Sequence, residues 1–197
     1  MRIIFATGNI DKVAEANILL KPLGHSVEIL TIDGKIPNLI EPQSHSLEEV
    51  AISKINQVRS MIINTELENS AIMVEDSGLF IDSLNNFPGV FSSFVYDSIG
   101  LSGILKLVNE DIIRGAEYRA VTIIYSNGEI QKSTGICRGR LSREELGDNG
   151  FGYDPIFIPE QGNGNTFSQM SNIDKSTISH RTYSLIGLLD SFKDPSK

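Results

Sequence analysis

The stretch FATGNIDKVAEA, residues 5–16, predicts the end of a buried strand, a glycine turn and the start of a helix. The apolar run over 2–7 supplies the strand, and Gly8 and Asn9 supply the turn. Apolar positions spaced three or four residues apart continue the helix over 11–21, until Pro22 ends it. Lys12 falls in the first helical turn, where the helix dipole disfavours a cation. It is therefore either a solvated side chain or a partner for a bound anion.

The rest of the chain alternates predicted strands and helices, which is typical of an α/β protein with a mixed sheet. Asn127-Gly128 is a hairpin turn signal between β-prone segments of residues 118–141. Because this hairpin interrupts the alternation, two lobes with a cleft are expected. The other expected strands are 25–32, 71–74, 79–84 and a short one at the end of 147–159, after a glycine-rich loop. The other expected helices are 47–63, 99–108 and 179–193.

Bulk composition limits the classes of function. A net charge of -8 argues against broad nucleic-acid binding, which needs a basic face. Cys137 is the one cysteine and cannot form an internal disulfide, so a reducing, cytoplasmic setting is expected. No apolar run approaches the ~20 residues of a membrane-spanning helix, so no membrane partner is expected. The length of 197 residues fits one domain, or one domain with two lobes.

Polar clusters directly follow apolar strands, where α/β folds bind ligands. Thr7, Asn9 and the backbone N–H groups at the helix start can donate to phosphate oxygens, and Lys12 adds charge. Glu75 and Asp76 follow the strand AIMV and should point to opposite faces, so they should have different roles. A carboxylate there is a Mg²⁺ ligand, a general base or a turn cap.

Two further charged residues allow two interpretations each. Glu41, in a loop, is either a second carboxylate ligand or a solvated side chain. Lys54 borders the apolar stripe of the second helix, from which it either extends to water or reaches a phosphate.

Two motifs near the C-terminus suggest recognition of a base. In GFGYDP, Phe151 and Tyr153 either stack on a nucleobase or pack inward, and Asp154 can accept from a ring N–H. In DKSTISHR, Ser179 can cap the last helix, which places His180 and Arg181 in its first turn. Together with Lys175 they favour an anion or carbonyl-oxygen site.

Four motifs in order, TGNIDK, EDSGL with FPGVFSS, GFGYDPIF and DKSTISHR, closely resemble the inosine triphosphate pyrophosphatase family. The resemblance covers residues 5 to about 190. It implies one pyrophosphatase domain over 1–197, with an elongated central mixed sheet flanked by helices and an active-site cleft between two lobes. It also implies a homodimer that uses Mg²⁺ to cleave deaminated purine triphosphates (ITP, dITP and XTP) to monophosphate and pyrophosphate. Rival interpretations are a Maf-like pyrophosphatase of other specificity and a non-catalytic nucleotide-binding module.

The resemblance also implies site roles. The catalytic residues are Asp76, Lys12 and Lys54, and the metal ligands are Glu41 and Asp76. Glu48 and Glu49 compete for the role of Glu41. The substrate-binding residues are Thr7, Gly8, Asn9, Ile10, Asp11, Lys12, Lys54, Ser77, Phe151, Gly152, Tyr153, Asp154, Lys175, His180 and Arg181.

Two further points concern the base and a departure from the family pattern. His180 and Arg181 are donors that suit a 6-oxo group and would be left unpaired by adenine. Rejection of guanine must depend on its 2-amino group, and the sequence does not indicate how. Many bacterial members have an arginine where this chain has Phe94.

Overall fold

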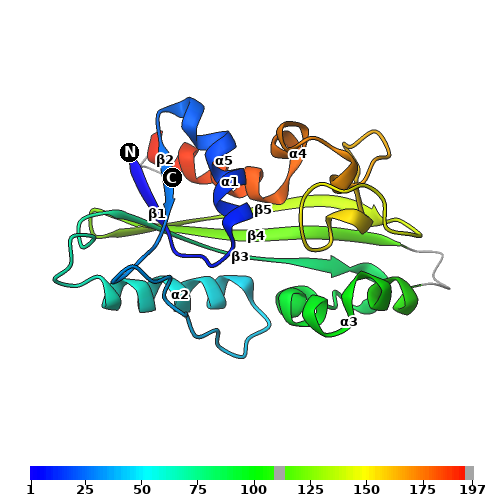
Figure 1. The fold of residues 1–197 in the computed structure, drawn as a ribbon, viewed down its shortest axis with the longest axis horizontal. Helices are drawn as coiled ribbons and strands as arrows, with labels where there is room; N and C mark the ends of the chain where they lie inside the picture. Colours follow the sequence, from blue (N-terminus) through cyan, green and yellow to red (C-terminus); the bar gives the residue numbers. More distant parts are fainter. Residues whose placement is uncertain (109–113, 194–197) are drawn as a thin grey trace.

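The computed structural model describes residues 1–108 and 114–193, and its central element is one six-stranded sheet in the order β2-β1-β3-β4-β5-β6 (Figure 1). β1 pairs in parallel with β2 and β3, whereas every pair from β3 to β6 is antiparallel. The predicted mixed sheet is thus confirmed. The strands are β1 (Arg2–Phe5), β2 (Ser26–Ile29), β3 (Ala71–Ile81), β4 (Gly115–Ser126), β5 (Glu129–Leu141) and β6 (Phe157–Pro159).

Helices cover both faces of the sheet. In Figure 1, α1, α4 and α5 lie above it and α2 and α3 lie below. The α-helices are α1 (Ile10–Leu20), α2 (Leu47–Met61), α3 (Ser92–Leu107), α4 (Asn172–Ile178) and α5 (His180–Lys193). Short 3-10 turns are η1 (Lys21–Leu23), η2 (Asp82–Leu84), η3 (Gly89–Phe91), η4 (Asp154–Ile156) and η5 (Phe167–Gln169).

β3 departs most clearly from the sequence prediction. We expected two strands with a polar turn at EDSG, but β3 is continuous, because β4 pairs with every residue from Ile72 to Ile81. Asp76 lies opposite Val121 in the middle of this pairing. The polar cluster therefore lies within a continuous buried strand and does not end it.

Two helices were also incompletely predicted. α3 begins at Ser92, well before the expected residue 99. The prediction missed its first part because Gly100, with φ 63°, breaks the helical period inside it. α4 was not predicted at all, although Ser171 caps it by accepting from the N–H of Asp174.

Within the described residues, the hydrophobic core has three clusters. One lies at the end of the sheet beside α3 and includes Leu79, Ile104 and Phe157. The others lie at the opposite end, one including Ile55 of α2 and one including Leu20 of α1. The core thus divides into two lobes on one sheet, as expected.

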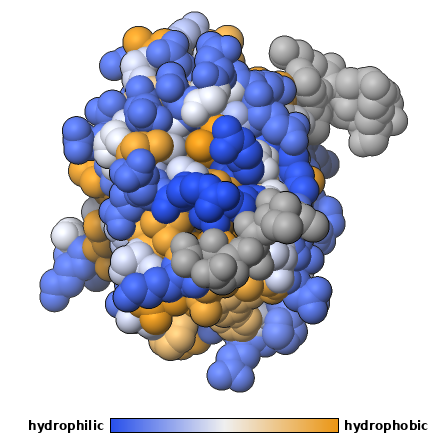
Figure 2. Space-filling model, turned by 90° about the vertical axis from the view of Figure 1, so that its right-hand side faces the viewer, coloured by the Kyte–Doolittle hydropathy of each residue, from blue (hydrophilic) through white to orange (hydrophobic). Residues whose placement is uncertain are grey.

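The helical segment Gly89–Leu107 corrects one expectation. It has 19 residues and a mean hydropathy of 1.2, so it is long and apolar enough to cross a membrane by length and composition. Gly100 interrupts this segment, and Val95 and Ile104 pack into the core. Its exposed side carries Phe94. Figure 2, which views the right-hand end of Figure 1, shows hydrophobic residues on the lower half, the side on which α3 lies.

Candidate active site

A cavity of about 800 Å³ lies between the two lobes. It is bounded by the β1–α1 turn, the segment 36–41, the middle of β3, the start of α3 and the loop 151–153. The predicted site residues that line it are Thr7, Gly8, Asn9, Lys12, Glu41, Lys54, Asp76, Ser77, Phe151, Gly152 and Tyr153. Six others lie outside its lining: Ile10, Asp11, Asp154, Lys175, His180 and Arg181.

The start of α1 is held by its own side chains. The Asn9 side-chain oxygen accepts from the N–H groups of Asp11 and Lys12, at 2.8 and 3.2 Å. Thr7 Oγ1 accepts from the Asn9 N–H at 3.1 Å. These two N–H groups therefore already have a partner within the protein, and their donation to a phosphate stays a prediction. The side chains of Ile10 and Asp11 point to solvent, Ile10 being largely exposed.

Glu75 and Asp76 contact separate sets of partners, as the strand period predicts. Arg181 donates to both Glu75 oxygens, from Nε and Nη2, each at 2.8 Å. Lys12 Nζ lies 3.4 Å from Glu75 Oε1. Burial opposes ionisation of Glu75, but Arg181 and then Lys12 hold its pKa below the usual range. Burial lowers the pKa of Lys12, against the opposing effect of Glu75.

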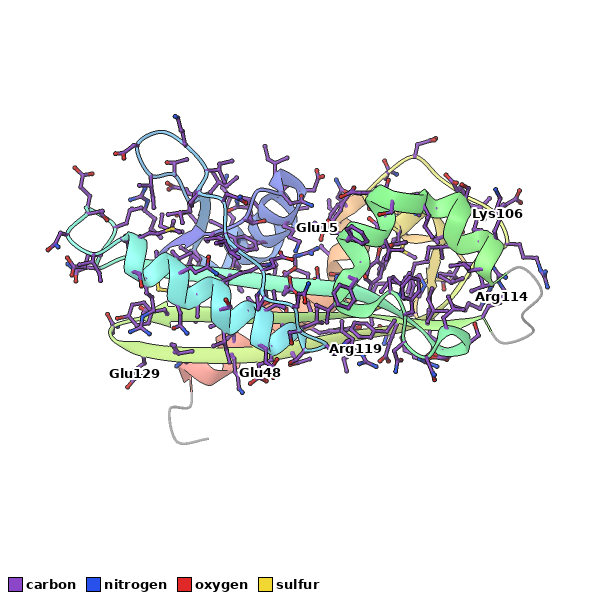
Figure 3. All side chains as sticks on the ribbon, turned by 90° about the horizontal axis from the view of Figure 1, so that it is seen from below. Glu15, Glu48, Lys106, Arg114, Arg119 and Glu129 are labelled. Atoms are coloured by element: carbon purple, nitrogen blue, oxygen red, sulfur yellow. The ribbon has the colours of Figure 1, made fainter. Side chains whose placement is uncertain are left out.

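Glu15 joins this cluster, and our sequence analysis missed it. It lies on α1 at the middle of the molecule (Figure 3). It accepts from Lys175 at 2.6 Å and also from Arg181 Nη1. Lys175 in turn donates to Asp154 at 2.5 Å. The available signal was spacing, because Glu15 follows Lys12 by three residues and so shares its face of α1.

On the other side of β3, Lys54 forms ion pairs with two carboxylates. Lys54 Nζ lies 2.7 Å from Asp76 Oδ1 and 2.6 Å from Glu41 Oε1. Asp76 Oδ2 is buried and has no hydrogen-bond partner among the residues that the structure describes. Burial raises the pKa of Asp76, although Lys54 opposes the shift. The structure brings together the two residues predicted to hold a metal.

The competing carboxylates have other partners. Glu48 pairs with Lys132 of β5, and Glu49 accepts from Ser44 Oγ at 2.6 Å. Among residues 1–108 and 114–193, no group of three or more His, Cys, Asp or Glu side chains is arranged to hold a metal. Mg²⁺ commonly binds one or two carboxylates together with substrate phosphates and water, which this pair of carboxylates fits.

The aromatic loop is only partly open. Tyr153 is buried and its hydroxyl donates to the Ser92 carbonyl at 2.8 Å, whereas Phe151 is half-buried, with Lys175 Nζ 4.8 Å from its ring centre. Asp154 is 2% exposed and accepts from the Phe151 N–H at 2.8 Å. This placement differs from the expectation that Asp154 faces a base, because its carboxylate is occupied within the protein.

His180 and Arg181 are buried and do not line the cavity. Ser179 caps α5 as predicted, since its Oγ accepts from the Thr182 N–H at 3.1 Å. His180 and Arg181 are 3% and 2% exposed. Burial and then Arg181 lower the pKa of His180 well below its usual value, so its ring is neutral.

Tyr118 separates His180 from the cavity, which it lines. It was not predicted. The two rings stack in parallel, with centres 4.5 Å apart and planes at 7°. The orientation of the His180 ring therefore depends on Tyr118.

Comparison with known proteins gives consistent matches over nearly the whole chain. The model of the Ham1 family matches residues 3–191. A dITP/XTP pyrophosphatase of Methanopyrus kandleri is 42% identical over 98% of this chain and 97% of its own. One from Pyrococcus horikoshii is 41% identical over 92% and 91% of the two chains. The solved structure of a HAM1 protein from Coxiella burnetii is 29% identical, with a TM-score of 0.80 over 98% of this chain and 99% of that one.

Proposed function

The chain belongs to the Ham1 family, and on that premise we propose that it hydrolyses non-standard purine nucleoside triphosphates to monophosphate and pyrophosphate. The relatives from Methanopyrus kandleri and Pyrococcus horikoshii are dITP/XTP pyrophosphatases, so dITP, ITP and XTP are the expected substrates. The observation that carries the proposal is the Asp76 carboxylate. One of its oxygens contacts Lys54, and the other is buried with no hydrogen-bond partner in the described part of the chain. The cavity that Asp76 lines is also lined by Lys12.

Asp76 and Glu41 are proposed to hold Mg²⁺. The unpartnered Asp76 Oδ2 and the nearby Glu41 supply the hard oxygen ligands that Mg²⁺ prefers. When bound, Mg²⁺ supplies charge neutralisation for phosphate oxygens and promotes ionisation of water. Asp76 also accepts a proton from the attacking water.

Charge balance supports the need for a metal. The charged groups joined around the cavity are five carboxylates (Glu15, Glu41, Glu75, Asp76 and Asp154) and four cations (Lys12, Lys54, Lys175 and Arg181). This excess of carboxylates leaves no surplus positive charge for a triphosphate. A divalent cation brought with the substrate corrects that balance.

Lys12 and Lys54 are proposed to bind the β- and γ-phosphates and the departing pyrophosphate. Both ammonium groups line the cavity and already contact carboxylates there. A lysine at the start of α1 is then explained, because a bound phosphate offsets the dipole that disfavours it.

The base is proposed to lie against the loop Phe151–Gly152–Tyr153, with its 6-oxo edge toward Lys175, His180 and Arg181. Phe151 stands between the cavity and two of these residues, since its ring contacts both Lys175 and Arg181. Direct hydrogen bonds to the base therefore require the Phe151 ring to shift when substrate binds. A neutral His180 donates one N–H to an oxygen acceptor and gives adenine no such partner.

We also propose that the protein is a cytoplasmic homodimer and that it binds neither a membrane nor nucleic acid. Phe94 and Ile99 on the exposed side of α3 supply an apolar surface for a second copy. Light scattering coupled to size exclusion tests the dimer by its mass.

One substrate panel tests the activity. Pyrophosphate release is measured from ITP, dITP, XTP, GTP, ATP, dTTP and UTP, with Mg²⁺ and with a chelator. We expect Mg²⁺-dependent release that is fastest for ITP, dITP and XTP. Equal rates for all seven nucleotides would refute the specificity, and binding without release would indicate a non-catalytic module.

A further inference from the structure

The segment between β2 and α2 presents a structural problem. It carries Glu41 to the cleft, yet it contains no helix or strand beyond the bridge between Ile32 and Lys35. Pro37 and Pro42 lack backbone N–H groups. The Glu41 side chain is 57% exposed, and its ion pair is with Lys54. Something other than regular structure must hold this backbone in place.

Gln57 of α2 supplies that support at the residue beside Glu41. Its Oε1 accepts from the Ile40 N–H at 2.9 Å, and its Nε2 donates to the Ile40 carbonyl at 2.7 Å. A single side-chain amide thus pairs with both backbone groups of one residue, as a neighbouring strand would. The orientation of the amide is fixed, because a flipped amide would place NH₂ against N–H and oxygen against oxygen.

No other backbone hydrogen bond holds this part of the described chain. Between residues 36 and 43, the contacts with Gln57 are the only ones made by backbone N–H or C=O groups. Leu39 packs against the core cluster beside α2, which restrains the segment without orienting its backbone. The amide of Gln57 is therefore the directional restraint on Ile40 and, through it, on Glu41.

Gln57 lies on the same helix as Lys54, the residue with which Glu41 forms an ion pair. Lys54 and Gln57 lie three residues apart on α2, so both project from one side of that helix. Gln57 Nε2 lies 3.2 Å from Ser53 Oγ, which further limits the amide. One helix thus holds both the backbone of Ile40, the residue before Glu41, and the ammonium group between Glu41 and Asp76.

We propose that Gln57 is a positioning residue, which sets Glu41 beside Asp76 and so determines the affinity of the metal site. The inference rests on the proposed function, in which these two carboxylates hold Mg²⁺. Gln57 touches neither substrate nor metal and acts through the Ile40 backbone. Outer partners of metal ligands commonly change metal affinity by about 10–100-fold when replaced.

The test compares three variants for pyrophosphate release from ITP. Gln57→Met keeps the length of the side chain and removes both hydrogen bonds. Gln57→Glu keeps an acceptor for the Ile40 N–H and loses the donor to its carbonyl. Asn56→Met is the matched control, since Asn56 is the exposed neighbour on the same helix.

We expect Gln57→Met to raise the Mg²⁺ concentration for half-maximal activity by about 10–100-fold. The KM for ITP at saturating Mg²⁺ should change by less than about threefold, because the lysines that bind phosphate are untouched. Gln57→Glu should fall between Gln57→Met and wild type, and Asn56→Met should match wild type.

Hydrogen exchange gives a readout that is independent of activity. Peptides covering 36–43 should exchange faster in Gln57→Met, while peptides of β3 and α2 exchange as in wild type. Global unfolding would raise exchange everywhere, and Gln57→Glu then serves as the test variant.

The outcomes separate the two proposals. If wild type releases no pyrophosphate with Mg²⁺, the proposed function fails. If wild type is active and Gln57→Met exchanges faster at 36–43 with an unchanged Mg²⁺ requirement, the positioning role is overturned. Unchanged exchange at 36–43 also overturns it.

Discussion

Replacing Arg181 with methionine should destabilise the fold strongly. Arg181 is 2% exposed and donates twice to Glu75, at 2.8 Å, as well as to Glu15. Methionine fills much of the space but leaves both carboxylates without their guanidinium. Breaking a buried ion pair in this way costs about 3–5 kcal/mol. With a urea dependence of about 2 kcal/mol/M, the unfolding midpoint should fall by about 1.5–2.5 M at pH 7.

The destabilisation should also depend on pH, with a definite sign. In wild type the pKa of Glu75 is below its unfolded value, so its contribution is present above the unfolded pKa and is lost as pH falls through the folded pKa. Without Arg181, burial dominates and the Glu75 pKa rises. The variant then takes up a proton that wild type does not, so its stability approaches that of wild type as pH falls.

Urea unfolding followed by circular dichroism at pH 8 and pH 5 measures both effects. The difference between wild type and variant should be smaller at pH 5. Arg2→Met is the control, because Arg2 meets Glu28 at 2.9 Å on the surface, where both side chains are about half exposed. A variant no less stable than this control, or the same difference at both pH values, would refute the reasoning.

Three other changes have defined outcomes. Asp76→Asn should reduce turnover below about a tenth of wild type while circular dichroism stays unchanged, because an amide is a poor metal ligand and proton acceptor; faster turnover would contradict the role. Lys12→Ala should weaken binding of a non-hydrolysable ITP analogue more than binding of IMP in competition assays, and equal losses would place Lys12 away from the outer phosphates. Gly135→Ala should lower the free energy of unfolding by about 1–3 kcal/mol and therefore lower Tm. The added Cβ would lie 2.0 Å from the His180 carbonyl oxygen and 2.3 Å from the Ser184 nitrogen. An unchanged Tm would contradict this prediction.

Local signals in the sequence predicted the features that depend on neighbours in the chain. The hairpin was predicted because Asn127 and Gly128 adopt positive φ, 53° and 87°, which few other residues tolerate. The division of roles between Glu75 and Asp76 followed from the strand period alone. Ser179 was correctly predicted as the cap of α5 because capping depends on residues within one turn.

Features that depend on distant segments were not available from the sequence. β3 is continuous because it pairs with β4, and in the sequence the whole of α3 separates these two strands. Glu15 acquires its importance from Lys175 and Arg181, which belong to helices at the other end of the sequence. Cations at the start of a helix favoured an anion or carbonyl-oxygen site, and the sequence did not show that Arg181 is buried against the carboxylates of Glu75 and Glu15.

The choice of Glu41 among three glutamates had the same limit. By sequence Glu48 and Glu49 competed with Glu41 for the role of metal ligand, and in the structure their partners are Lys132 of β5 and Ser44 of the preceding loop. No local pattern shows which carboxylate reaches Lys54. That distance depends on how the segment before α2 folds back across the helix.

The uninterrupted ladder of the central sheet has a consequence for motion. β4 pairs with β5 from Gly115↔Arg140 to Ser126↔Glu129, and β3 pairs with β4 past the cleft. Rotating one lobe against the other would require bending these strands in the middle, at the expense of several backbone hydrogen bonds. Adjustment to a bound ligand therefore falls to the loop 151–153, because Gln57 of α2 holds the segment 36–41 at Ile40. Asp76 belongs to the fixed sheet, so its carboxylate keeps its place while that loop moves.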